Sequence, residues 1–497
     1  MTVEPSSWGA VRDDGRGAAA FRSDIDALTA VVVVAGIACS ILFVVIGLLY
    51  ELQMYGDGSI FSYSVAVRDS WAFHWHNISG RLFVYLFSFV PAKTFVKLTH
   101  DAHGGIVIYG FLFFVVQLLG LIATFAADRS KGRIIFKYAC CSTALLCPLV
   151  FGFPTEIWMA HALFWPALAA CHFMRDGIVW ILSIFAILLA LVFTHGGALI
   201  FANVILATLL LRGARDAVFP RIAGVFVAVL SIWLLVQMAY PADAYVAAVL
   251  ARAALRVFDI SILGGDLIVL LGIAIASYGI VFLMLRQLAI SNEYLYAALA
   301  VALGLVLYWW RFDHALHTDN RYYLRTVILI ATPALGVLAA AYALDADEKL
   351  NRPIPLLRRL VPVLTSGAAV RAATGAFLLV MLIHSVETVK FVEEWTDYKN
   401  AIRALAAGTA SDPTLGNPRF VSSERIDPRL YRLSWFSTTH FLSILVTPNM
   451  APARIVVDPT ASYFWLSCKT AVASEERKVP VPAESRRLVR IHACLHR

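Results

Sequence analysis

The chain has 497 residues, of which 60% are hydrophobic and 15% charged, and its mean hydropathy is +0.75. Soluble globular proteins carry far more charge, so this composition excludes a soluble enzyme or binding domain and predicts an integral membrane protein. The net charge of +8 requires no nucleic-acid partner, because Lys and Arg in short loops orient a membrane protein and contact lipid headgroups.

The first predicted element is a membrane-spanning helix over 28–50, after a cytoplasmic segment at 1–27. Its apolar run of about 23 residues exceeds the roughly 7 to 15 of a signal peptide and has no evident cleavage site, so we expect it to be retained. Similar runs predict an all-α polytopic protein of about eleven transmembrane helices. The further spans are expected at 104–127, 133–153, 157–173, 177–194, 197–211, 219–239, 265–287, 294–310, 323–344 and 368–389.

The basic loops predict the orientation. Lys and Arg gather at 128–137, 175–177, 211–221 and 348–360, which fall on one side of the membrane if the N-terminus is cytoplasmic. Positive loops are retained in the cytoplasm, so the intervening loops are expected on the outer side of the inner (plasma) membrane. That side is the periplasm in a bacterium.

The first outer loop, 51–103, is long and partly apolar. We expect two interfacial amphipathic helices in it, at 58–75 and 81–98, lying flat on the membrane. Asp57 precedes the first of them in "YGDG". The flanking glycines allow the carboxylate to be approached closely by a ligand, while the alternative and compatible role is a helix N-cap.

Three further ionisable residues lie at or within the predicted spans. Glu156, in "FPTEIW", opens a span, where a carboxylate also suits the positive end of a helix. His161 lies about one turn deeper, at a cost unless it faces a cavity or a partner. His195, in "FTHGGAL", stands beside two glycines, and an ordinary hydrated histidine is the alternative.

The densest polar loop is "YWWRFDHALHTDNRYYLR", at 308–325. The planar fork of arginine donates two parallel charged hydrogen bonds, which suits a phosphate or pyrophosphate. An aromatic belt with a hydrated loop is the alternative. The candidate substrate-binding residues are Arg311, His314, Arg321 and Arg325, with Arg252 and Arg256 in the preceding outer loop and with His161 and His195.

The remaining residues, 391–497, lose the membrane composition and predict a small α/β domain on the outer side. An amphipathic helix is expected at 391–408, followed by short strands in "RFVSS", "HFLSILVTP" and "ARIVVDP". This domain either covers the site, binds the acceptor, or serves as a structural cap. Cys468 and Cys494 either form a disulfide or remain two thiols.

This layout resembles the C-type (GT-C) superfamily of integral membrane glycosyltransferases. The likeness covers about 390 residues: a cytoplasmic N-terminus, an acidic residue opening the first outer loop, two amphipathic helices in that loop and many spans. The resemblance implies a polyprenyl-phosphate-linked sugar donor, with Asp57 acting on the acceptor and Glu156 as a second acidic residue. The chain departs from the family in lacking a W-W-D-x-G signature and in having Gly58 where an acidic pair is frequent.

We therefore expect transfer of a sugar to an extracytoplasmic glycan, lipid or protein by inverting displacement, with Asp57 as base and arginines on the departing phosphate. Because arginines can neutralise a monophosphate, we expect no cofactor, although a divalent metal stays open. The alternatives are a polysaccharide polymerase or ligase of the O-antigen type, which would not need Asp57, and a lipid or solute transporter, which would place its charges near the middle of the membrane.

Overall fold

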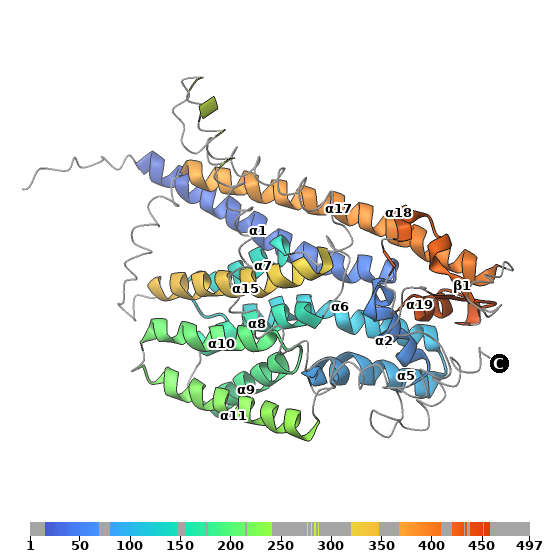
Figure 1. Cartoon of the computed structure of the whole chain (residues 1–497). Coiled ribbons are helices and arrows are strands. Elements are labelled where there is room, and N and C mark those ends of the chain that lie inside the picture. Colours follow the sequence, from blue (N-terminus) through green and yellow to red (C-terminus); the bar gives the residue numbers. More distant parts are fainter. Residues whose placement is uncertain are drawn as a thin grey trace, which may run out of the picture.

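The computed structural model describes residues 15–68, 80–146, 156–173, 177–213, 216–240, 320–346, 367–408, 420–431, 433–434, 438–450 and 452–457, with single residues between 276 and 287. The described part is mostly helical (Figure 1). The long helices are α1 (Gly15–Leu49), α6 (Ala102–Ala127), α7 (Ile134–Leu145), α8 (Glu156–His172), α9 (Ile178–Val192), α10 (Ala198–Thr208), α11 (Val218–Ala239), α15 (Asn320–Asp345) and α17 (Gly367–Ala407).

Six described helices are long and apolar enough to cross a membrane, which confirms a helical multi-pass membrane protein. Five of them coincide with expected spans: Ile25–Leu49, Ala102–Ala127, Val218–Ala239, Ile328–Asp345 and Ala373–Ala407. Shorter apolar helices occupy three other expected spans, at Ile134–Leu145, Ile178–Val192 and Ala198–Arg212. The predicted spans at 265–287 and 294–310 lie outside the described residues, apart from a few single positions in the first.

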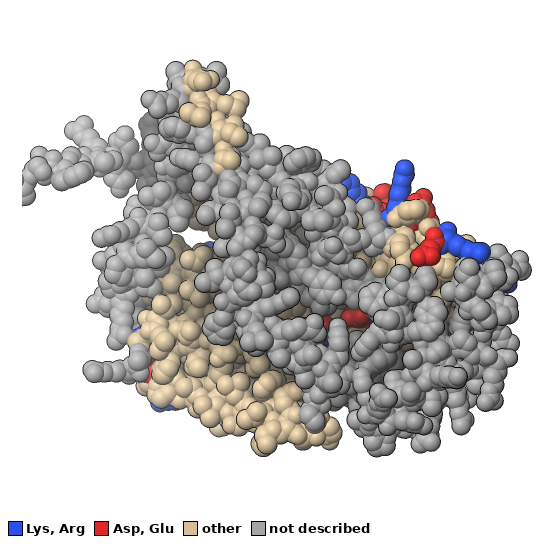
Figure 2. Space-filling view, in the orientation of Figure 1, with Lys and Arg blue, Asp and Glu red and all other residues tan. Residues whose placement is uncertain are grey.

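The surface of the described helices has the polarity of a membrane protein. In Figure 2 the described surface over α10 and α11 shows charge only at its edge, and several described charged side chains gather near α18 (Pro428–Tyr431) and the adjoining end of α17. Large apolar side chains of α11, such as Leu235 and Met238, are 64% and 71% exposed. In water this exposure would be costly, and a lipid environment removes that cost.

Small residues allow the helices of the bundle to approach closely. A Cβ atom on Gly120 of α6 would lie 2.5 Å from the carbonyl oxygen of Ala162 in α8. Likewise, a Cβ on Gly36 of α1 would lie 2.6 Å from Cα of Cys140 in α7. Such contacts are typical of helices that associate within membranes, where van der Waals packing replaces the hydrophobic effect.

The first loop, 51–103, is largely helical where the structure describes it. It comprises η1 (Leu52–Met54), α2 (Asp57–Ala66), and then α4 (Leu82–Val84), η3 (Tyr85–Phe89) and α5 (Val90–Thr99), which follow one another without a break. One face of this second helix is buried, at Ala92 and Val96, whereas Lys97 and Leu98 are exposed. Its length and composition also fit a membrane span.

α17 continues through the expected domain boundary at 390 without interruption, so its C-terminal part belongs to the same 41-residue helix as the last span. Beyond it lie η8 (Ser423–Arg425), α18 (Pro428–Tyr431), α19 (Thr439–Leu445) and η9 (Pro448–Met450). β1 (Phe420–Ser422) pairs in parallel with β2 (Ile455–Val457), as the strand predictions in "RFVSS" and "ARIVVDP" required. The strand predicted in "HFLSILVTP" is wrong: it forms α19, because a short continuous apolar run does not distinguish a buried helix from a strand.

Candidate functional site

The turn between α1 and α2 depends on its two glycines. Gly56 has φ 56° and ψ −132°, a conformation that is strained for any residue with a Cβ atom. A Cβ on Gly58 would lie 2.3 Å from the carbonyl oxygen of Gln53. Asp57 is the first residue of α2 and Gly56 is its N-cap, so the N-cap role considered for Asp57 is wrong. Its carboxylate nevertheless lies at the positive end of the helix.

α2 does not lie on a membrane surface as predicted. Seven of its residues, Ser59 to Val65, are buried, because α2 packs between α6 and α19. Ser59 Oγ donates to the carbonyl of Thr438 at 3.2 Å, and the rings of Tyr63 and Phe441 lie 5.3 Å apart. The apolar side chains that suggested lipid contact instead face the C-terminal segment.

An ion pair joins the first loop to the start of α8. Arg81, directly before α4, donates from Nη1 to Oε1 of Glu156 at 2.8 Å, and the two side chains are 19% and 9% exposed. Glu156 is the first residue of α8. Nearby, the amide of Phe83 donates to the carbonyl of Phe193, which follows α9. The starts of α4 and α8 and the end of α9 therefore meet at one end of the bundle.

Tyr109 of α6 connects this ion pair with Asp57. Its side chain is 3% exposed, and its phenol lies within electrostatic range of Glu156, Arg81 and Asp57. α6 packs against both α2 and α8, the helices that begin at Asp57 and Glu156. We call Asp57, Arg81, Tyr109 and Glu156 the polar cluster.

The members of the polar cluster differ in how their charges are compensated. Glu156 is neutralised by Arg81. Within the described part of the chain, Asp57 is half-buried and has neither a hydrogen-bond nor an ion-pair partner for its carboxylate. Arg81 uses only Nη1 there, which leaves its other N–H groups available to an anion. The polar cluster thus combines an available base, a guanidinium with N–H groups that have no partner among the described residues, and a phenol.

His161 and His195 are not members of the cluster. His161 is fully buried, with Nε2 2.9 Å from Ser142 Oγ and Nδ1 3.3 Å from Gln117 Oε1. It therefore links α8 to α7 and α6 within the bundle. His195 accepts a hydrogen bond at Nδ1 from the amide of Gly197 at 3.0 Å, which orders the turn before α10.

The other predicted site residues are not tested by side-chain geometry. Arg321 and Arg325 lie in the first turns of α15, of which only the backbone is described. The residues that lie outside the described part altogether are Arg252, Arg256, Arg311, His314, Cys468 and Cys494.

Sequence reasoning missed Arg81 and Tyr109 as site residues. Arg81 stood in the same loop as Asp57, so its position in that loop was an available signal. Tyr109 lies in an apolar span with no motif around it, and only the packing of α2 and α8 on α6 gives it a role. Among the described residues, no three His, Cys, Asp or Glu side chains are grouped as metal ligands.

No protein-family model, curated protein or solved structure matches this chain.

Proposed function

We propose that this protein is a membrane glycosyltransferase that moves a sugar from a polyprenyl-phosphate donor to an extracytoplasmic acceptor. The observation that supports this function is the convergence of Asp57 and Glu156. They lie 99 residues apart in the sequence (57 and 156), yet both lie in electrostatic range of Tyr109. Glycosyl transfer from a phosphate requires a base for the acceptor hydroxyl and positive charge for the departing phosphate, which we assign to Asp57 and to the unused N–H groups of Arg81.

The displacement assigns a role to each member of the cluster. An acceptor hydroxyl attacks the anomeric carbon and gives its proton to Asp57, while the bond from that carbon to the phosphate oxygen breaks and inverts the centre. The departing polyprenyl phosphate gains negative charge, which the unused N–H groups of Arg81 stabilise. Glu156 holds Arg81 in place, and the Tyr109 hydroxyl supplies a neutral hydrogen-bond donor.

The proposed side of the membrane follows from the loops at the two ends of α6. The cluster lies towards the end that begins at Ala102, whereas Lys131 and Arg133 follow the other end. Since positive loops stay in the cytoplasm, we place the cluster on the outer side of the inner membrane. A position near one end of the bundle also disfavours a transporter, whose charges would line a path across the membrane.

The test compares wild type with Asp57→Asn in detergent, using a panel of polyprenyl-phosphate donors that carry radiolabelled sugars and a mixed glycan and lipid acceptor fraction. We expect Asp57→Asn to lower the transfer rate by roughly 10² to 10⁴-fold, because it removes only the base. The matched control is Asp101→Asn, an exposed position in the same loop where Asn retains the N-cap of α6.

Either of two results would reject the proposal. A folded Asp57→Asn protein that transfers sugar as fast as wild type would remove Asp57 from the chemistry. A wild-type protein that turns over no donor with any acceptor fraction would favour the polymerase or transporter alternatives.

A further inference from the structure

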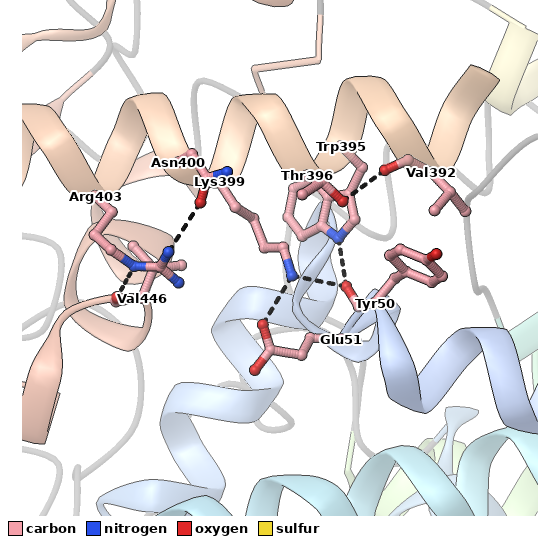
Figure 3. A network of polar contacts seen from close by, with 9 residues as sticks. All are labelled: Tyr50, Glu51, Val392, Trp395, Thr396, Lys399, Asn400, Arg403 and Val446. Carbon is pink, nitrogen blue, oxygen red and sulfur yellow. Dashed lines mark hydrogen bonds and ion pairs between the residues drawn. The ribbon is translucent and has the colours of Figure 1, made fainter. Parts of the chain in front are cut away.

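The end of α1 is held by two side chains of α17. The carbonyl of Tyr50 accepts hydrogen bonds from Trp395 Nε1 at 2.8 Å and from Lys399 Nζ at 2.9 Å (Figure 3). The same Lys399 ammonium forms an ion pair with Glu51 Oε2 at 2.8 Å. We call Trp395 and Lys399 together the α17 clamp.

Helix-end chemistry explains why a lysine occupies this buried position. The last carbonyls of a helix have no partner within the helix and carry its partial negative charge, which an ammonium group satisfies. Lys399 is only 6% exposed, and lysine is almost never buried to this degree unless it is paired. Its Nζ also lies 5.5 Å from the ring centroid of Trp395, a favourable cation–π distance.

The clamp acts on the segment that leads directly to Asp57. Glu51 has φ 57°, a left-handed conformation that is uncommon for a residue other than glycine. The five residues from Leu52 to Gly56 are all buried. Among them, Tyr55 packs edge-on against Phe391 and Trp395 of α17, at 5.2 and 5.1 Å. α17 therefore contacts this short segment at both of its ends.

We propose that Lys399 is a positioning residue that acts through Tyr50 and Glu51 to fix the backbone carrying Asp57. The catalytic part of this statement rests on the function proposed above, whereas the mechanical part does not. Because α17 continues without a break from the last span into the C-terminal segment, the clamp makes the C-terminal segment a support of the polar cluster.

The mechanical part is tested by hydrogen–deuterium exchange of the full chain in detergent. Lys399→Met keeps the aliphatic stem but removes the ammonium, and we expect the amides of residues 50–58 to exchange roughly tenfold faster or more. The matched control is Arg403→Gln, one turn further along α17, where the guanidinium bonds to Val446 and Asn400 among the described residues. It should leave residues 50–58 at the wild-type rate.

A milder variant keeps the test decisive if Lys399→Met does not fold. Trp395→Phe removes the indole N–H while retaining an aromatic ring against Tyr55, and we expect roughly threefold faster exchange over the same residues. Wild-type exchange over residues 50–58 in folded protein of either clamp variant would overturn the proposal.

The catalytic part is tested by steady-state transfer kinetics. Lys399→Met should lower kcat roughly tenfold and leave the donor KM within about twofold of wild type, because Lys399 holds the base and not the donor. Lys399→Arg, which retains the charge, should restore much of kcat. Faster exchange without any transferase activity in wild type would reject the glycosyltransferase function while supporting the clamp. Faster exchange with unchanged kcat would overturn the positioning role.

Discussion

Asp57 and Glu156 are carboxylates of similar chemistry, but their environments give them different exposure and different partners. Glu156 is 7% exposed and bound to Arg81, so its charge is committed to an ion pair. Asp57 is half-buried and uncompensated within the described part of the chain, so it remains available as a base. At the residue scale, these environments fit the roles that we propose, in which Asp57 is the base and Glu156 holds Arg81.

The coupling of Arg81 with Glu156 gives one prediction. Arg81→Gln removes the cation that pairs with a nearly buried carboxylate and should lower the free energy of unfolding by about 3 kcal/mol. Adding Glu156→Gln should restore much of this loss, because both charges are then absent. Thermal or denaturant unfolding of the two single variants and the double variant measures the coupling, and strictly additive losses would contradict it.

The turn before Asp57 gives a second prediction. Gly56→Ala should destabilise the protein by about 1 to 3 kcal/mol, because alanine is strained at φ 56° and ψ −132°. Gly224→Ala in α11 is the control, since a Cβ atom there meets nothing within 4 Å. We expect a change below about 1 kcal/mol for the control in the same unfolding measurement. Equal effects of the two substitutions would contradict the strain at Gly56.

At the element scale, α8 is the best-buried helix in the described bundle. Nearly every one of its residues from Glu156 to His172 is buried, so a polar side chain within it must find partners on its neighbours. His161 does so with Ser142 of α7 and Gln117 of α6. This arrangement makes His161 a link between helices and not a contact of the polar cluster.

The role of His161 yields a third prediction. His161→Leu should lower the free energy of unfolding by about 1 to 3 kcal/mol, because Ser142 and Gln117 lose their buried partner. Transfer activity per folded molecule should stay within about twofold of wild type. Loss of activity at unchanged stability would instead return His161 to the substrate-binding residues.

At the scale of the whole molecule, the described buried residues form two hydrophobic cores. One joins the end of α1, the first loop, the beginning of α6, the C-terminal part of α17 and the C-terminal segment. The other joins α7 through α11 with α15. The described part of the C-terminal segment therefore shares its core with the loop that carries Asp57.

This shared core gives a fourth prediction. Phe441→Ala in α19 should destabilise its core by about 3 to 5 kcal/mol and increase hydrogen exchange in residues 57–66 of α2 as well as in α19. Phe226→Ala, in the other core, should leave α2 protected. Exchange that rises in α19 alone would show that the C-terminal segment opens independently.

Sequence patterns predicted part of the site and failed at identifiable points. Asp57 and Glu156 could be found because each opens an element and lies in a recognisable local motif. Arg81 and Tyr109 gain their role from neighbours on other helices, which no local pattern encodes. The interfacial position predicted for α2 failed for a related reason, because its apolar face is covered by α19, almost 380 residues away in the chain.

The sequence by itself determined that the chain is a helical membrane protein, and it located most of the described helices. These properties are local, since an apolar run must satisfy its backbone hydrogen bonds within itself to lie in lipid. Only the tertiary structure decided which charges are compensated. The Arg81–Glu156 pair joins residues 75 apart and the Lys399–Glu51 pair joins residues 348 apart. The packing of α6, α8 and α17 determines which of these residues pair, because an ion pair between two segments depends on the positions of both segments.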